Sequence, residues 1–415
     1  PILETVEPNL AEDGTGGGKY YIYHVATGKF LSAGNESGTQ LSVDSIGQEI
    51  TLVYGEEREP VYGQKPVVPG TGWVFNMLNG PTNGNRFHEI YMTGVDKAFV
   101  DCGADGHTLY NITKNEDNDY YRIKVVPQDP TYGEESTAGE LYYENGFWGV
   151  PSSGSTAVYP LADLNLPEFK DYTVDWVFAT KEARDIYVAK KSLYQALNYA
   201  TEKNYPETAG YLAIYNDEGK TPVEVSEAAE NLMRAVNTYI VSGATETNPT
   251  DLTDRVANPN FDGGNNGWTD TETSVGLGHQ AGTAYSDPDD PTLEMNSFCE
   301  KWKAAPYSMP ANIHQVLTNM PQGHYRLSAL TLGYNQANWE ESARGLYLFA
   351  NDSRAEAGTI KHGGLKNGEP APDDPAAPAP RVVTLDFYSC GGNITIGLMT
   401  ENTNCNWIGF DNVQL

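Results

Sequence analysis

The segment from Tyr334 to Arg344 combines an aromatic ring with several polar side chains, the residue types that hold a sugar. Trp339 lies in the middle of the segment, Asn335 stands four residues before this tryptophan, and Arg344 is the last residue of the segment. The CH face of a pyranose packs on a flat aromatic ring, and planar polar groups orient its hydroxyls. We therefore expect carbohydrate contacts from this segment and from a second aromatic residue: Trp339, Tyr334, Asn335, Arg344 and Trp302. The alternative is that Trp339 only seals the edge of the fold.

Sequence motifs of several common enzyme classes are absent. The chain has no Gly-x-Ser-x-Gly, His-Glu-x-x-His, P-loop or Gly-x-Gly-x-x-Gly pattern, and its seven histidines are scattered. A glycosidase needs only two carboxylates, and 56 acidic residues supply such pairs by chance. We expect no catalytic residue, and hydrolysis stays open as a less favoured alternative.

Residues 18–180 have the composition of an all-β module. Short runs rich in Tyr, Val, Ile and Phe alternate with Gly, Asn, Asp and Pro. A short pattern recurs three times, at Gly28–Gly34, Lys97–Gly103 and Asn145–Val150. Each copy leads to a later aromatic strand, at Gly72–Phe75, Tyr120–Ile123 and Asp175–Phe178, and the first copy has an insertion over Glu56–Gly70.

This threefold pattern resembles a β-trefoil of the ricin-type lectin kind. One unit cannot bury its inner face alone, whereas three units close a barrel with a cap. Ricin-type lectins usually carry Gln-x-Trp at the end of each repeat, but here Trp73 follows Gly and Trp176 follows Asp. The resemblance therefore implies a fold, and we carry over no sugar-contacting residue from that family.

Residues 181–242 change to a helical period, with apolar residues at three- and four-residue spacing. Thr221 and Glu224 have the spacing of a capping box, with Pro222 at the first helical position. We predict two helices joined by a Tyr-rich connection over Tyr205–Asn216. This αα-hairpin resembles the helical spacers of cell-surface bacterial glycan proteins.

Residues 251–415 form another β-rich module. An Asn-Pro-x-Phe motif at Asn258 leads to Gly-Trp at Gly267, and the chain closes with Asn406–Leu415. These motifs, in this order, resemble the galactose-binding-like jelly rolls, which are β-sandwiches of two antiparallel sheets and commonly bind carbohydrate in loops at one end. With the trefoil-like module, the chain resembles secreted or surface glycan-associated proteins of gut bacteria.

The middle of this module contains a Pro-x-Gly turn signal at Pro321. The turn predicts a hairpin, and the alternation that follows predicts an inward face made by Tyr325, Leu327 and Ala329.

Jelly rolls of this kind often hold a structural Ca²⁺ where the first and last strands meet. Calcium takes oxygen ligands, and the resemblance implies Asn258, Asp262 and Asp411 as ligands. No other cofactor is expected.

The chain is strongly acidic, with 56 Asp and Glu against 26 Lys and Arg and a formal net charge of −30. Such a charge repels nucleic acid and anionic membranes, and no apolar stretch is long enough to predict a transmembrane segment. Residues 1–17 predict a flexible leader. Reduced cysteines are favoured, with a Cys390–Cys405 disulfide as the alternative if their strands are neighbours.

These patterns favour non-catalytic binding of an oligo- or polysaccharide by a chain that is secreted or anchored on the outer cell surface. The first alternative is an adhesion or protein-interaction module, which a large apolar patch would favour. The less favoured alternative, a glycoside hydrolase, requires a cleft with two carboxylates.

Overall fold

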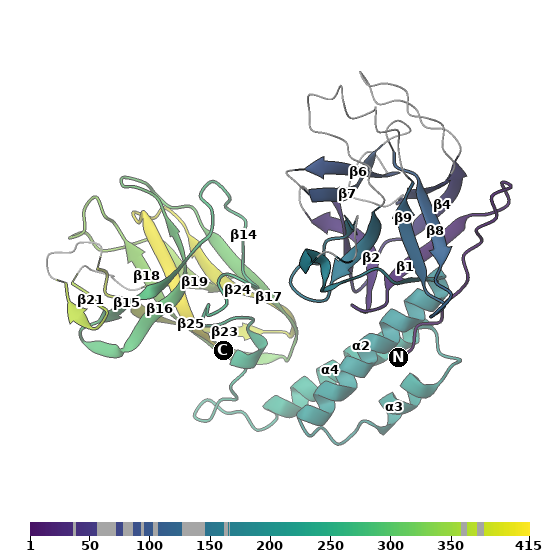
Figure 1. Cartoon of the computed structure of the whole chain (residues 1–415). Coiled ribbons are helices and arrows are strands. Elements are labelled where there is room, and N and C mark those ends of the chain that lie inside the picture. Colours follow the sequence, from purple (N-terminus) through teal and green to yellow (C-terminus); the bar gives the residue numbers. More distant parts are fainter. Residues whose placement is uncertain are drawn as a thin grey trace. The chain divides into compact units, whose positions relative to one another are not determined.

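The computed structural model divides the chain into two compact units, which we describe separately (Figure 1). Unit 1 comprises Pro1–Gln195 and Tyr211–Ala229, and unit 2 comprises Ala196–Gly210 and Glu230–Leu415. Both are built mainly from antiparallel strands. The structure describes residues 1–35, 39–55, 72–77, 86–92, 95–102, 107–126, 146–161, 165, 167–357, 363–371 and 377–415. Among the sequence features named above, Glu56–Gly70, Gly103 and Asn145 lie outside these residues.

The described part of unit 1 contains 13 short strands in one hydrogen-bonded network. They are β1 (Gly18–His24), β2 (Lys29–Asn35), β3 (Gln40–Asp44), β4 (Ile50–Gly55), β5 (Gly72–Asn76), β6 (Arg86–Met92), β7 (Val95–Cys102), β8 (Tyr110–Lys114), β9 (Tyr121–Val125), β10 (Phe147–Pro151), β11 (Tyr159–Leu161), β12 (Tyr172–Thr173) and β13 (Trp176–Ala179). A short 3₁₀ helix, η2 (Pro167–Phe169), precedes β12.

Six of these strands close a ring through successive antiparallel pairs. The pairs are β1–β4, β4–β5, β5–β8, β8–β9, β9–β13 and β13–β1. Between ring strands the chain forms the hairpins β2–β3, β6–β7 and β10–β11. A closed ring pairs each of its strands on both sides, which removes the exposed edges of an open sheet.

The strand order shows that the three copies of the sequence pattern do not occupy equivalent strands. The chain makes three passes, β1–β4, β5–β8 and β9–β13, and the first and last strand of each pass are paired. The repeated pattern falls on the second strand of the first and third passes, β2 and β10, but on the third strand of the middle pass, β7.

Aromatic side chains fill the interior of unit 1. Phe75, Trp148 and Trp176 are fully buried in a common hydrophobic cluster. The buried indole nitrogen of Trp176 donates to the carbonyl oxygen of Trp148 at 3.0 Å, which satisfies its hydrogen-bonding requirement inside the core.

The N-terminal segment contacts this core at two residues, which differs from the flexible leader predicted for residues 1–17. The backbone nitrogen of Val6 donates to the carbonyl oxygen of Phe178 at 2.8 Å. Val6 and Leu10 both pack against the buried cluster, and burial of these apolar side chains stabilises the docked segment.

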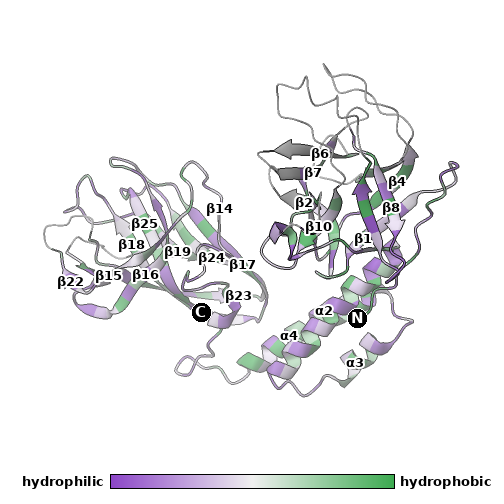
Figure 2. Ribbon diagram, viewed as in Figure 1, coloured by the Kyte–Doolittle hydropathy of each residue, from purple (hydrophilic) through white to green (hydrophobic). Residues whose placement is uncertain are grey.

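Three helices follow the strands of unit 1: α2 (Lys181–Glu202), α3 (Ala209–Asn216) and α4 (Pro222–Val241). Helices α2 and α4 contain both hydrophobic and hydrophilic residues along their length (Figure 2), and the hydrophobic ones recur at the predicted helical spacing. The capping box is confirmed, because the hydroxyl of Thr221 donates to the Glu224 carboxylate at 2.9 Å and accepts from the Glu224 backbone nitrogen at 3.3 Å. Helix α3 occupies the connection that was not predicted to be helical. None of the helices in the described part of the chain is long and apolar enough to cross a membrane.

Two antiparallel sheets form the β portion of unit 2. The described five-stranded sheet has the order β14 (Thr269–Asp270), β17 (Asn312–Met320), β24 (Gly392–Thr400), β19 (Leu346–Ala350) and β20 (Ser353–Glu356). The described seven-stranded sheet has the order β22 (Glu369–Pro370), β21 (Leu365–Lys366), β15 (Gly278–Asp287), β16 (Asp290–Trp302), β25 (Trp407–Gln414), β18 (Gly323–Tyr334) and β23 (Arg381–Ser389). A 3₁₀ helix, η3 (Thr253–Arg255), precedes both sheets.

One buried cluster takes residues from both sheets, so the sheets share a hydrophobic core as a β-sandwich. Leu327 and Ala329 are buried in it and Tyr325 packs against it, which confirms the predicted inward face of β18. Trp268, near the start of the module, is also buried.

The predicted hairpin at Pro321 is wrong. Strand β17 pairs with β24 and β14, whereas β18 pairs with β23 and β25. The Pro-x-Gly turn therefore carries the chain from one sheet to the other. A turn signal fixes where a strand ends, but the partner of that strand depends on residues far away in the sequence.

The described cysteines of unit 2, Cys299, Cys390 and Cys405, are free thiols. The structure thus has no Cys390–Cys405 disulfide. The side chain of Cys102 lies outside the description.

Candidate functional site

Strand β16 ends with one buried and one exposed side chain. Lys301 is fully buried and donates to the carboxylate of Asp270 and to the carbonyl oxygens of Glu272 and Pro310, the last two at 2.7 and 2.6 Å. Three acceptors compensate the ammonium for its lost hydration. Successive residues of a strand face opposite sides, and the next residue, Trp302, leaves 53% of its surface exposed. The ion pair therefore anchors the strand end that presents this indole.

Trp302 belongs to a row of three aromatic residues on neighbouring strands. Trp302 lies opposite Trp407, and Trp407 lies opposite Tyr334. Tyr334 is only 1% exposed and packs with Trp407 in a second buried cluster. Because its ring presents no exposed face, Tyr334 is not available for the sugar contact that the sequence pattern predicted for it. Its side chain contributes to the packing of the sheet instead.

A glutamine fixes the orientation of the exposed indole. The indole nitrogen of Trp302 donates to the side-chain oxygen of Gln336 at 2.7 Å. Asn406 donates to the same oxygen at 2.8 Å, and its own side-chain oxygen accepts from the Gln336 backbone nitrogen at 2.7 Å. Asn406 also donates to the carbonyl oxygen of Lys303. These bonds restrain the Trp302 ring before any ligand arrives, which lowers the entropic cost of binding.

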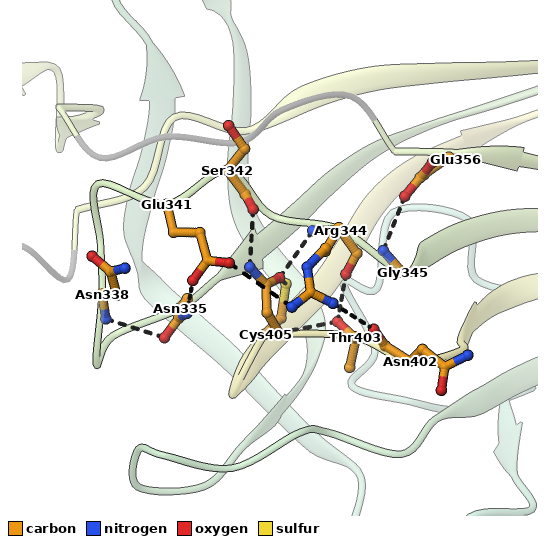
Figure 3. A network of polar contacts seen from close by, with 11 residues as sticks. Asn335, Asn338, Glu341, Ser342, Arg344, Gly345, Glu356, Asn402, Thr403 and Cys405 are labelled. Carbon is orange, nitrogen blue, oxygen red and sulfur yellow. Dashed lines mark hydrogen bonds and ion pairs between the residues drawn. The ribbon is translucent and has the colours of Figure 1, made fainter.

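The loop after Gln336 is held by its own side chains and by the segment before β25 (Figure 3). The side-chain oxygen of Asn335 accepts from the backbone nitrogens of Ala337 and Asn338 at 3.1 and 3.2 Å. Asn404 accepts from the Arg344 backbone nitrogen at 2.9 Å and donates to the Ser342 carbonyl oxygen at 2.9 Å. Both ends of the loop are therefore fixed.

The remaining predicted contacts lie on this loop. Trp339 is 36% exposed and follows Gln336 by three residues. Arg344 is exposed, and its guanidinium donates to the carbonyl oxygen of Asn402 at 3.1 Å and lies 3.9 Å from Glu341. The structure thus places Trp302, Asn335, Trp339 and Arg344 at one end of the sandwich.

Sequence reasoning missed the residues that organise this end. Gln336, Asn404 and Asn406 orient Trp302 and pin the loop. A signal was present, because asparagines alternate at Asn402, Asn404 and Asn406 immediately before the closing strand. Small polar side chains at every second position are suited to bonding a facing loop.

Glu300 stands two residues before Trp302 on β16. Its carboxylate accepts a hydrogen bond from the indole nitrogen of Trp407 at 2.7 Å. Partial burial raises the pKa of Glu300, and the Trp407 bond opposes this shift. Glu300 therefore helps to position the buried indole next to the exposed one.

The three candidate calcium ligands gather near the first and last strands of unit 2. Asp411 is 1% exposed, and burial, together with the charge of Asp262, raises the pKa of its carboxyl to about 7. The Asn258 side chain instead holds the loop, because its nitrogen donates to the Gly264 carbonyl oxygen at 2.7 Å and its oxygen accepts from Gly263 at 3.3 Å. Two carboxyl groups therefore interact here, and that of Asp411 is buried.

No cluster of three or more His, Cys, Asp or Glu with metal-binding geometry occurs among the residues that the structure describes. A cation at Asp262 and Asp411 would consequently depend on backbone or amide oxygens for its other ligands.

Comparison with known proteins gives no family: no family model and no curated protein matches the sequence. Among solved structures, the chain is similar to the CBM22-1 xylan-binding domain from Paenibacillus barcinonensis Xyn10C, with 12% identity over 36% of this chain and 83% of that one at a TM-score of 0.22. It is also similar to a cyclase from Fischerella sp. TAU, with 15% identity, coverage of 38% and 93%, and a TM-score of 0.24.

A third similar structure is the K1 cleaved adhesin domain of Lys-gingipain from Porphyromonas gingivalis W83, with 10% identity, coverage of 36% and 89%, and a TM-score of 0.22. TM-scores of this size do not establish a shared fold or a shared function.

Proposed function

We propose that the chain is a non-catalytic carbohydrate-binding protein, secreted or anchored on the outer cell surface, that holds an oligo- or polysaccharide at one end of the unit 2 sandwich. The surface that we assign to the ligand, called the loop surface below, consists of Trp302, Asn335, Trp339 and Arg344, and Gln336 orients the Trp302 ring within it. The observation that carries the proposal is the exposed and restrained ring of Trp302. It is 53% exposed, and Gln336 holds its indole nitrogen.

The loop surface has the chemistry that a pyranose requires. The exposed Trp302 face covers the CH face of a sugar ring, an apolar contact of large area with little conformational entropy to lose. Arg344 presents a planar polar group to the hydroxyls, and the bond from its backbone nitrogen to Asn404 fixes its position. The side chain of Asn335 shapes the loop, because its oxygen accepts from the Ala337 backbone nitrogen and its nitrogen donates to Glu341. We propose binding without catalysis, because stacking and hydrogen bonds hold a sugar without a group that gains or loses a proton.

The folds of both units support an accessory role. We assign the six-stranded ring with its three hairpins to the β-trefoil fold, with residues 18–180 as that module. We assign the two sheets of residues 251–415 to a galactose-binding-like jelly roll, with residues 181–242 as a helical spacer between the modules. Modules of these kinds commonly bind ligands without transforming them, although a fold alone does not determine a function.

The test is a glycan-array screen of the intact chain, with Trp302→Ala and Trp339→Ala beside the wild type. We expect a defined glycan to bind and Trp302→Ala to weaken it at least tenfold, about 1.4 kcal/mol, without a change in melting temperature. Val53→Ala is the control, because Val53 is 53% exposed but belongs to β4 of unit 1.

Absence of glycan binding by the wild type would contradict the proposal and favour a protein partner. Release of shorter sugars from a bound glycan would contradict its non-catalytic part.

We also propose a structural Ca²⁺ at Asp262 and Asp411, on the loop ordered by Asn258. When bound, the ion would neutralise the two carboxylates and join the start of the module to its last strand. We expect millimolar Ca²⁺ to raise the melting temperature of unit 2, excess chelator to reverse the rise, and Asp411→Asn to abolish it. Asp386→Asn is the control, since Asp386 is an exposed carboxylate on β23. Equal melting temperatures with Ca²⁺ and with chelator would refute the proposal.

A further inference from the structure

The sandwich of unit 2 also carries an exposed aromatic ring outside the loop surface. Tyr388 is 49% exposed and stands near the end of the edge strand β23. In this strand Val383, Leu385 and Phe387 are buried, whereas Thr384, Asp386 and Tyr388 face outward. The outward face of β23 therefore presents this ring to solvent.

Neighbouring side chains restrain Tyr388 in the way that Gln336 restrains Trp302. The side-chain nitrogen of Gln322 donates to the Tyr388 hydroxyl at 2.5 Å. His324, directly opposite on β18, packs its ring at 5.0 Å between centroids and 60° between planes. The rings of Trp302 and Tyr388 are thus each bonded through their polar atom to a glutamine side chain. A restrained ring gives up little conformational freedom when a ligand packs on it.

Next to this ring, an arginine and an aspartate form an ion pair with no net charge. The guanidinium of Arg326 donates twice to the Asp386 carboxylate, at 2.8 and 3.1 Å, and the two residues are directly opposite on β18 and β23. The bidentate pair orients both groups while their remaining donors and acceptors face solvent. Because the two charges compensate each other, the surface suits a neutral, hydroxyl-rich ligand better than an anionic one.

We propose that the Tyr388 patch, formed by Gln322, His324, Arg326, Asp386 and Tyr388, is a second contact surface for a neutral polysaccharide. This inference rests on the proposed function of the loop surface. The ring of Tyr388 covers the CH face of a sugar, and the Arg326–Asp386 ion pair forms hydrogen bonds with the sugar hydroxyls.

The two surfaces lie at opposite ends of β18. His324 is near its start and Tyr334, which adjoins the loop surface, is its last residue. Ten residue steps along a strand correspond to about 33 Å. A short fragment therefore engages one surface at a time, whereas a polymer engages both, and the second contact raises its apparent affinity by effective concentration.

The experiment compares soluble neutral polysaccharides (xylan, mixed-linkage β-glucan and galactomannan) with their tetrasaccharides, using the intact chain in affinity electrophoresis and calorimetry. For a polymer that binds, we expect Tyr388→Ala to weaken affinity about tenfold and to change tetrasaccharide affinity less than twofold. Trp302→Ala weakens both. Tyr239→Ala is the matched control, a tyrosine that is 43% exposed on α4.

Tyr388→Phe keeps the ring without its hydroxyl, and we expect it to retain most of the polymer affinity. Unchanged polymer affinity in Tyr388→Ala, with Trp302→Ala impaired, would overturn the second surface and leave the proposed function intact. A wild type that binds neither polymer nor fragment would overturn both.

Discussion

The two units use the same residue type in different ways. All three tryptophans of unit 1, Trp73, Trp148 and Trp176, are buried. Of the four in unit 2, Trp268 and Trp407 are buried, whereas Trp302 and Trp339 are exposed. A large aromatic side chain stabilises a fold when it is buried and is available for a ligand only when a face stays open. The difference assigns a stabilising role to the unit 1 tryptophans and leaves exposed indoles for the proposed recognition surface on unit 2.

Replacing a unit 1 tryptophan tests the stabilising side of this comparison and should have the largest effect. Trp148 is fully buried and packs against the rings of Phe75, Tyr110 and Trp176. We expect Trp148→Ala to lower the free energy of unfolding of unit 1 by about 3–5 kcal/mol. Chemical denaturation measures this change, and glycan binding by unit 2 should be retained. A loss below about 1 kcal/mol would contradict the assigned core role.

Breaking the ion pair beneath Trp302 should come next. Lys301→Met leaves the nearly buried Asp270 carboxylate without its cation. We expect unit 2 to lose about 3 kcal/mol of unfolding free energy, because an uncompensated buried charge is costly. In the double variant Lys301→Met with Asp270→Leu, part of the loss should be recovered. If the single and double variants unfold alike, the charge is not the cause.

Acid should weaken unit 1 through His24. This residue is fully buried; burial lowers its pKa, which the Thr173 hydrogen bond and the Asp175 charge partly oppose. As pH falls below the unfolded pKa of about 6.5, the unfolded chain takes up a proton that the folded chain resists, so stability falls by at most about 1.4 kcal/mol per pH unit. Denaturation at pH 7.5 and 5.5 measures the loss. His24→Gln should reduce this dependence, and an unchanged pH profile would exclude His24 as its source.

Removing the restraint on Trp302 should have the smallest effect. Gln336→Ala deletes the acceptor of the indole nitrogen but leaves the ring in place. We expect glycan affinity to fall about threefold, roughly 0.7 kcal/mol, through lost orientation. Calorimetry should show the loss mainly as a less favourable binding entropy. An effect as large as that of Trp302→Ala would instead make Gln336 a direct contact of the ligand.

Local patterns in the sequence determined those features that depend on neighbours along the chain. The helical period of α2 and α4, the capping box at Thr221 and the inward face of β18 each involve residues a few positions apart. The aromatic and polar composition of the segment from Asn335 to Arg344 likewise marked one end of unit 2 as a candidate surface. Such features follow from the geometry of a helix or strand alone.

Strand pairing and solvent exposure depend on residues far apart in the sequence, and only the tertiary structure showed them. It placed β17 and β18 in different sheets, docked Val6 and Leu10 on the unit 1 core, buried Tyr334 and left Trp302 exposed. It also joined Trp302 to Gln336, 34 residues away along the chain, and Gln336 to Asn406, 70 residues away. Strand pairing and solvent exposure depend on which segments meet in space, and a residue's own neighbours do not carry that information.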